Sequence, residues 1–392
     1  CYIHDPDART NQWTKQNGEM VHPCGTDALR IAADSGTVVR YNDFIGSDRH
    51  RYNDMIEGAN NGAIKWASVG RDSDIYGNMF IYSQDDILET DGGQMNVRVY
   101  ENRGEQSLCG FSTAPSSMGP SYFFRNVLTN SGTEIDEQWG QSMKMGGLSP
   151  DGYNGIIYIF NNTFDVVSHV LKNGNYGGSS EYHSVSRNNI AITRTPGNYS
   201  LRSYFANERD SNDYDLCNGV VDLQKNNGKD ELHMIVGEPT YEDMANGDFR
   251  LTADSLGVGA GENLPNFSDG YVTDGKTDIG AFERGSDRRA MPYRPVDMWA
   301  DTYFAQIKHG EERSFTVHIG DVEDIGYSVV KNIDYGWLEI LTPTEGTTNK
   351  NGDITVTIKA NLDNCEYAEG NGMVLFRLDN GYSVPVTVYA TR

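Results

Sequence analysis

The chain has little positive charge and no long apolar run. Its 392 residues contain 32 Lys and Arg against 56 Asp and Glu, which gives a formal net charge of −24. No basic run interrupts this balance, so we expect no nucleic-acid partner. No stretch approaches about 18 consecutive apolar residues, and the sequence therefore predicts no transmembrane segment. Such an acidic composition is typical of a secreted protein, and we expect an extracellular or cell-surface location.

Cysteine and proline are also scarce. The chain has 5 Cys and 12 Pro, and no CxxC pair occurs, so a zinc or redox motif has no support. The histidines form no HExxH or HxxEH pattern, which leaves metalloprotease chemistry without support. The 43 Gly and 23 Tyr, together with abundant Asn and Asp, instead favour many short strands joined by turns.

An Asn recurs after a short β-type run throughout the first half of the chain. The repeat is about 24 residues with insertions in some copies, a length that suits one coil of a parallel β-helix. Asn at the same turn of every coil can pass side-chain hydrogen bonds along the stack. The residues concerned are Asn42, Asn78, Asn102, Asn126, Asn162 and Asn189. Because residues 2–5 already read as the end of a coil, we expect further coils to precede Cys1.

The pattern changes after residue 295. Residues 313–319, 353–359 and 383–389 alternate between apolar and polar with period two, and about seven short strands fit into this part of the chain. We predict an all-β protein: a right-handed parallel β-helix over residues 1–284, a polar linker over 285–295 and a small antiparallel β-sandwich over 296–392. Trp337 is expected in the core of the sandwich.

The densest acidic segment covers residues 84–93. If it is a strand with Leu88 directed to the core, strict alternation places Ile87, Glu89 and Asp91 on the outer face. Two positions along a strand separate Glu89 from Asp91 by about 6.6–6.8 Å. This spacing overlaps that of the acid and the base in an inverting glycosidase.

An equivalent acidic segment precedes this one by a single coil. Matching Asp54 with Asp86 and Glu57 with Glu89 stacks the two glutamates about 4.8 Å apart, and such proximity raises one carboxyl pKa. Asp86, Glu89 and Asp91 are therefore the candidate acid/base centre, with Glu57 beside the substrate. Two other interpretations stay open: a calcium site at Asp85 and Asp86, or plain solvated turns.

Two segments resemble known secreted proteins. Residues 247–255, 257–261 and 277–283 resemble the closing stretch of secreted bacterial right-handed parallel β-helix proteins of the pectate-lyase-like type. That resemblance implies a final strand and loop that end the helix. The C-terminal part resembles the BACON-type sandwich domains that bacteria append to secreted carbohydrate-active proteins.

The run from Asp85 to Lys144 resembles a family of bacterial β-helix proteins described as lyase-like. The shared features are Asp85-Asp86, Glu89, Asp91-Gly92, residues 96–99, Gly119-Pro120, Arg125-Asn126 and Lys144. The resemblance implies an extracellular glycan-active fold. In a β-elimination, Lys144 would abstract a proton while Arg98 or Arg125 neutralises a uronate carboxylate, and His169 would line the same groove.

Two functional hypotheses follow. The first is a secreted enzyme that cleaves an extended polysaccharide or cell-surface glycan in a groove on the β-helix, with Ca²⁺ as the one cofactor considered. Hydrolysis is favoured over elimination because the acidic residues form a stronger cluster than the basic ones. The second is a non-catalytic surface protein, an adhesin or fibre subunit, because stacked solenoids join readily end to end and self-assemble.

Overall fold

The computed structural model describes most of the chain. The described residues are 1–392 without 5, 7–13, 17–18, 22–24, 47–50, 61–62, 65–67, 133–139, 147–153, 174–182, 204–209, 224–230, 245–246, 273–274, 287–297, 303, 321, 332–335, 366–368 and 380–382. The chain divides into two compact units, residues 1–293 and residues 294–392.

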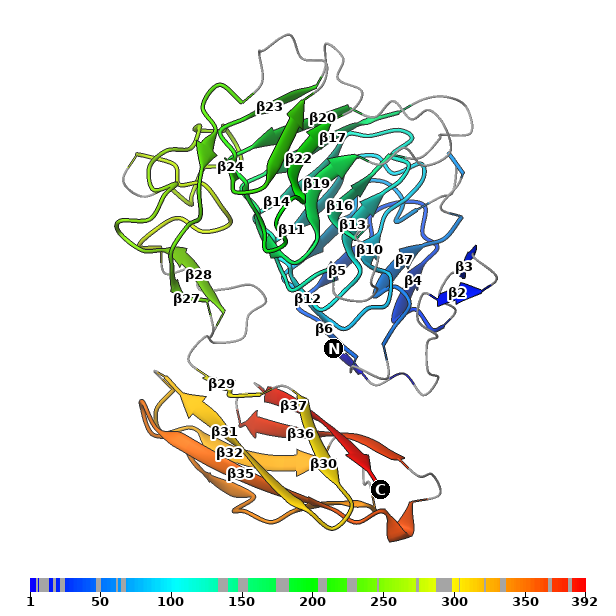
Figure 1. The fold of residues 1–392 in the computed structure, drawn as a ribbon, viewed down its shortest axis with the longest axis vertical. Helices are drawn as coiled ribbons and strands as arrows, with labels where there is room; N and C mark the ends of the chain where they lie inside the picture. Colours follow the sequence, from blue (N-terminus) through cyan, green and yellow to red (C-terminus); the bar gives the residue numbers. More distant parts are fainter. Residues whose placement is uncertain are drawn as a thin grey trace. The chain divides into compact units, whose positions relative to one another are not determined.

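The first unit is a parallel β-helix built from three stacked sheets (Figure 1). The nine-stranded sheet contains β1 (Tyr2–His4), β6 (Asp43–Ile45), β9 (Met79–Ile81), β12 (Arg103–Glu105), β15 (Val127–Thr129), β18 (Thr163–Val166), β21 (Ile190–Thr193), β24 (Leu216–Cys217) and β26 (Ile235–Val236). The eight-stranded sheet contains β4 (Leu29–Ile31), β7 (Ile56–Gly58), β10 (Asp86–Glu89), β13 (Cys109–Thr113), β16 (Gln141–Met145), β19 (His169–Asn173), β22 (Tyr199–Ser203) and β25 (Val220–Leu223). The seven-stranded sheet contains β5 (Val38–Arg40), β8 (Asp74–Tyr76), β11 (Val97–Tyr100), β14 (Ser121–Phe124), β17 (Ile156–Phe160), β20 (His183–Arg187) and β23 (Ser211–Asp213).

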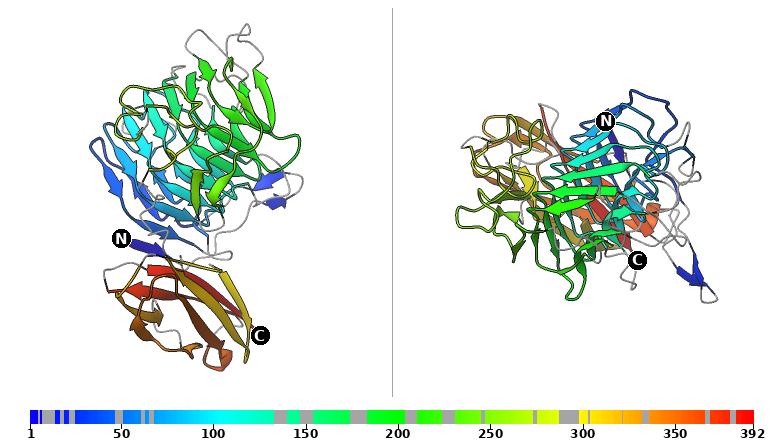
Figure 2. Two further views of the ribbon diagram at one scale, coloured as in Figure 1. Left: turned by 90° about the vertical axis from the view of Figure 1, so that its left-hand side faces the viewer. Right: turned by 90° about the horizontal axis from the view of Figure 1, so that it is seen from above.

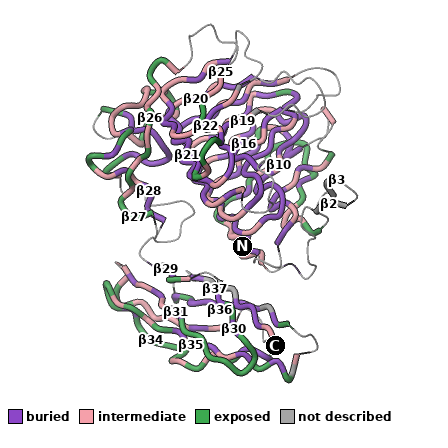
Figure 3. The backbone as a smooth tube through the Cα atoms, in the orientation of Figure 1, coloured by how far each residue is buried: buried purple, intermediate pink, exposed green. Residues whose placement is uncertain are grey.

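Successive coils stack strand upon strand (Figure 2), and like residues lie in register. Ile75, Val99, Phe123 and Ile159 are register partners on neighbouring strands, and all four are buried. Figure 3 shows the buried residues following the stacked strands through this unit. A single coil could not remove these side chains from water, so their burial requires the stack.

The predicted Asn ladder is confirmed. Each Asn donates from Nδ2 to the Oδ1 of the Asn one coil further on, over 2.9–3.1 Å. The ladder ends where Asn189 Nδ2 donates to Asp215 Oδ1 over 2.9 Å. Asn78, Asn102, Asn126, Asn162 and Asn189 have no exposed surface, so the amides satisfy one another inside the turn.

The closing part of this unit contains a strand followed by a long loop, as expected, but the strand pairs in a hairpin and does not stack on the coils. Residues 248–251 form β28 (Asp248–Leu251), which pairs with β27 (Tyr241–Asp243) in an antiparallel hairpin. The described residues of 257–286 contain no strand and pack beside the coils. The buried Arg125 fixes this segment to the coils. Its Nη2 donates to Glu283 over 2.9 Å, and its Nη1 donates to the Ala281 carbonyl over 3.1 Å. A charge removed from water needs such partners.

The second unit consists of two facing sheets. The four-stranded sheet contains β29 (Met298–Ala300), β31 (Glu312–Ile319), β35 (Asp353–Ala360) and β33 (Leu338–Ile340). The five-stranded sheet contains β30 (Phe304–Lys308), β37 (Ser383–Thr391), β36 (Glu369–Leu378), β32 (Gly326–Lys331) and β34 (Glu345–Thr347), and the described strand pairs are antiparallel except β30–β37. Trp337 is buried in the core between them, as predicted.

The remaining elements are small. β2 (Thr14–Gln16) and β3 (Glu19–Val21) form a hairpin, and η2 (Leu362–Asn364) is a single 3₁₀ turn. Within the described part of the chain, no helix has the length and apolar character needed to cross a membrane. The predicted fold class, a parallel β-helix followed by an antiparallel β-sandwich, is confirmed.

Candidate active site on the eight-stranded sheet

Charged side chains form one line along the eight-stranded sheet, which we call the charged row. Its members are successive register partners, and all lie one position after a core residue in strands such as β10 and β16. The charged row consists of Arg30, Glu57, Glu89, Lys144, Lys172, Arg202 and Asp222, with the uncharged Ser112 between Glu89 and Lys144. Between the end residues Arg30 and Asp222, two acidic residues are followed by three basic ones, so a single sheet face carries both signs of charge.

Glu57 and Glu89 are register partners on β7 and β10, which confirms the predicted stacking of the two glutamates. Burial, a hydrogen bond with Asp27 and the charge of nearby Asp27 and Glu89 together raise the pKa of Glu57 to about 8. Arg30, whose Nη1 lies 3.3 Å from Glu57 Oε2, opposes this shift. Glu57 therefore keeps its proton at neutral pH, which is the property of a general acid.

A buried acidic cluster, defined as Asp54, Asp85, Asp86 and Asp91, adjoins Glu89 at the start and the end of β10. The Asp86 backbone N–H donates to Asp54 Oδ1 over 2.9 Å, and Asn53 Nδ2 donates to Asp54 Oδ2 over 2.8 Å. Burial raises the pKa of Asp54 well above its usual value, and the neighbouring carboxylates raise it further. Burial is also the main cause that raises the pKa of Asp86 and of Asp91.

The ammonium of Lys144 reaches this cluster from two strands away and donates to Asp86 Oδ2. Burial raises the pKa of Asp86 while the ammonium opposes that rise. Burial lowers the pKa of Lys144, but Asp86, Asp85 and Asp91 raise it by more, so its net shift is upward. The direct contact favours the ionised pair. The Lys144 ammonium then supplies the positive charge that a bound cation would otherwise supply to the cluster.

Two expectations from strict alternation are corrected here. Ile87 is fully buried in the same apolar core as Leu88, because β10 begins at the corner where the chain leaves β9. Asp91 is buried beyond the end of β10, where its Oδ1 accepts hydrogen bonds from Ser112 Oγ and the Ala114 N–H, each over 2.6 Å. Asp91 therefore binds the next coil and does not occupy an open position beside Glu89.

Among the described residues, two groups of side chains have the spacing for a metal ion. Asp54, Asp86 and Glu89 each offer an oxygen within 4.8 Å of the others, and so do Asp85 and Asp86 with the thiol of Cys109. Calcium takes six to eight oxygen ligands, so the three carboxylates suit it better than the set that includes a thiol. The Lys144 ammonium already contacts Asp86, however, and competes with any cation there.

The other predicted substrate-binding residues lie apart from Lys144. Arg98 belongs to the seven-stranded sheet, where its guanidinium pairs with both carboxylate oxygens of Asp74 over 2.5 and 2.7 Å. Arg125 is buried against Glu283. His169 does lie on the eight-stranded sheet, in β19, but it is 6% exposed and its Nδ1 accepts from the Tyr199 N–H over 3.0 Å.

Lys172 and Arg202 are the site residues that sequence analysis missed. They continue the charged row in register with Lys144. Burial and then the neighbouring guanidinium of Arg202 lower the pKa of Lys172, which moves this amine toward the range of a general base. The signal in the sequence was a basic residue recurring at intervals of about one coil, interrupted by insertions of different length.

Comparisons with known proteins add no function. No protein-family model matches the chain, and no curated protein matches it. Among solved structures, the periplasmic chaperone SfaE matches with a TM-score of 0.21 and 10% identity over 24% of this chain and 56% of that chain. WR4, a C. elegans MSP family member, matches with a TM-score of 0.19 and 8% identity over 24% and 96% of the two chains. A protein of unknown function from Porphyromonas gingivalis W83 matches with a TM-score of 0.19 and 12% identity over 24% and 47%. These scores are too low to support an argument from likeness.

Proposed function

We propose that this protein is a secreted carbohydrate-active enzyme that hydrolyses a glycosidic bond of an extended polysaccharide along the charged row. One observation carries the proposal: the carboxyl group of Glu57, with a pKa of about 8, is in register with Glu89 one strand away. A carboxyl group that keeps its proton at neutral pH, next to a second carboxyl group, is the equipment of a glycosidase. The stacked coils supply a long face that suits a polymer.

In this proposal Glu57 donates its proton to the oxygen of the leaving sugar, and the Glu89 carboxylate acts at the anomeric carbon. Neighbouring strands lie about 4.8 Å apart, which is closer to the 5–5.5 Å carboxyl separation of retaining enzymes than to the wider separation of inverting ones. Glu89 would then form a glycosyl–enzyme ester, which water hydrolyses after Glu57 has become a base. The pair Glu57–Glu89 replaces Glu89–Asp91 because the Asp91 carboxylate is occupied by Ser112 and Ala114.

A second candidate reaction is β-elimination on a uronate polymer. Two neighbouring residues support it. Burial, and to a lesser degree the charge of Arg202, lowers the pKa of Lys172, and the guanidinium of Arg202 lies on the next strand in register with Lys172. The amine would remove the C5 proton beside the uronate carboxylate while Arg202 neutralises that carboxylate. The C4–C5 double bond forms as the C4–O4 bond breaks, and the leaving oxygen takes a proton from water. Local positive charge of this kind is what a protein with a net charge of −24 needs in order to attract an acidic polymer.

The experiment is a screen of the full chain against neutral and uronate polysaccharides, with and without EDTA. New reducing ends and the absorbance of unsaturated uronates are read together. Hydrolysis predicts reducing ends without that absorbance, a loss of turnover in Glu89→Gln, and a fall in kcat/KM above about pH 8, because Glu57 must be protonated. Glu345→Gln, on the exposed strand β34 of the second unit, is the matched control and retains full turnover.

Each alternative gives a different result in the same screen. Elimination predicts the absorbance signal and its loss in Lys172→Met. A calcium requirement predicts that EDTA abolishes turnover and that added Ca²⁺ restores it. Silence across the panel, in protein shown to be folded, contradicts both reactions and favours the non-catalytic surface protein.

A further inference from the structure

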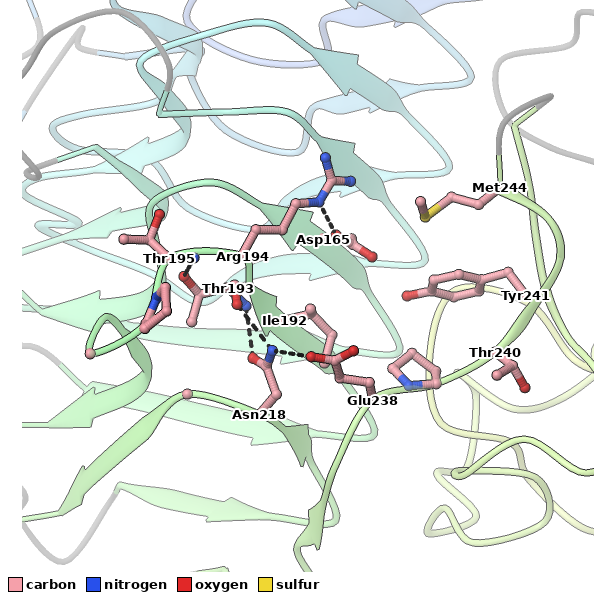
Figure 4. Close-up of a pocket in the computed structure, with 14 residues that line it drawn as sticks. Asp165, Ile192, Thr193, Arg194, Thr195, Asn218, Glu238, Thr240, Tyr241 and Met244 are labelled. Carbon is pink, nitrogen blue, oxygen red and sulfur yellow. Dashed lines mark hydrogen bonds and ion pairs between the residues drawn. The ribbon is translucent and has the colours of Figure 1, made fainter.

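A cavity of about 670 Å³ lies beside the nine-stranded sheet (Figure 4). Its lining comes from β18 and β21, from the turns that follow β21 and β24, and from residues 238–244 at the entry to the β27–β28 hairpin. The charged row contributes no residue to it. The volume is within the range of about 300–1,000 Å³ that small-molecule sites occupy.

Arg194 brings a fixed donor group to this cavity. Its Nε donates to Asp165 Oδ1 over 2.7 Å, and its Nη1 donates to Asn130 Oδ1 over 2.5 Å. Among the described residues, none accepts a hydrogen bond from Nη2. The guanidinium is therefore held rigidly by two partners while one nitrogen remains available to a ligand.

Tyr241 supplies a second group that lacks a partner. Its Oη atom is buried and has no hydrogen-bond partner among the described residues. In Figure 4 this hydroxyl is directed toward the other side chains that line the cavity. Buried hydroxyl groups are nearly always hydrogen-bonded in native proteins, so an orphan that faces a cavity indicates that something else completes it.

The charges of the lining select the kind of ligand. Arg194 neutralises Asp165, and Glu238 on the far wall accepts a hydrogen bond from Asn218 Nδ2 over 3.2 Å. With both carboxylates ionised, one negative charge is left over, which disfavours uronates and sulfated sugars. Apolar surface comes from Pro239, Met244 and Ile192, all of which line the cavity.

We propose that this cavity binds a neutral saccharide unit. Sugar hydroxyls would donate to the carboxylates of Glu238 and Asp165 and accept from Arg194 Nη2 and Tyr241 Oη. The C–H face of the ring would lie on the apolar part of the lining. The proposal concerns binding at a second place on the β-helix and does not depend on turnover at the charged row.

Isothermal titration of the full chain with neutral hexasaccharides of gluco, manno, galacto and xylo configuration tests this site. The titrations are run on a Glu89→Gln background, so that turnover cannot interfere. Tyr241→Phe removes one hydroxyl that holds no other part of the protein, and we expect it to weaken binding about three- to tenfold. Tyr158→Phe, on β17 of the seven-stranded sheet, is the matched control and leaves the affinity unchanged.

The outcomes separate clearly. Binding of a neutral hexasaccharide that Tyr241→Phe weakens and Tyr158→Phe does not would support the site. Binding restricted to oligouronates, or strengthened for them alone by Glu238→Gln, would overturn the neutral assignment. Failure of every hexasaccharide to bind, or equal affinity in Tyr241→Phe and the parent, would overturn the proposal, whatever activity the charged row shows.

Discussion

Lys144→Met removes the ammonium that contacts the acidic cluster and leaves a side chain of similar length. Asp86, which has no exposed surface, then keeps a carboxylate without its cation. Breaking a buried ion pair from one side costs about 3–5 kcal/mol, because the remaining charge stays out of water. We expect a loss of this size in the free energy of unfolding at neutral pH.

The pH dependence of this loss has a defined sign. Burial already raises the pKa of Asp86 above its value in the unfolded chain, and loss of the ammonium raises it further. A carboxyl group with a raised folded pKa binds its proton more tightly in the native state, so stability falls as pH rises above the unfolded pKa. One such proton changes the free energy by about 1.4 kcal/mol per pH unit, so the variant should recover up to about 2.7 kcal/mol between pH 7 and pH 5.

Urea unfolding at pH 5, 6 and 7, followed by far-ultraviolet circular dichroism, measures both effects. Lys172→Met is the matched control, because this lysine lies on the same row and its pKa is lowered by burial and Arg202. The control should lose less than about 1 kcal/mol and show little change with pH. Equal losses in the two variants, or a Lys144→Met deficit that grows on acidification, would refute the assignment of Lys144 as the cluster's counter-ion.

Two further substitutions test the fold. Asn102→Ala removes the four buried hydrogen bonds that this side chain makes in the ladder and should cost about 2–5 kcal/mol in urea unfolding. Asn42→Ala, at the partly exposed first position of the ladder, should cost under about 1 kcal/mol, and similar costs for the two variants would contradict the ladder's role. Gly370→Ala places a Cβ 2.6 Å from the Trp337 ring and should destabilise the second unit by about 1–3 kcal/mol, measured by calorimetry. Gly336→Ala is the control, because a Cβ there meets no atom within 4 Å, and it should leave the transition unchanged. An unshifted transition in Gly370→Ala would contradict this packing.

The parts of the structure that repeat were predictable from sequence. The Asn spacing predicted the ladder, and the similarity of the segments around Asp54 and Asp86 predicted the register that places Glu57 beside Glu89. Both follow from the one rule that stacked coils bring like positions together. The alternation of apolar and polar residues after residue 295 likewise predicted the sandwich and the buried Trp337.

The parts that depend on side-chain reach or on segments far apart in the chain were not predictable. Lys144 reaches across the intervening strand β13 to contact Asp86, and no spacing rule in the sequence predicts this contact. Arg125 looks like a surface charge in sequence, but Glu283, more than a hundred residues later, makes it a buried one. Lys172 was hidden because insertions of varying length precede each coil, so its register with Lys144 appears only in the folded sheet.

The measurement that tests the central claim most directly is turnover of the polysaccharide panel by the parent protein and by Glu57→Gln and Glu89→Gln, with folding of each checked by circular dichroism. The account predicts new reducing ends without unsaturated uronate for the parent, and a loss of at least about a hundredfold in both variants, since each removes a carboxyl group that acts in the reaction. Folded variants that retain the parent's turnover, or a folded parent that cleaves no polysaccharide, would contradict it.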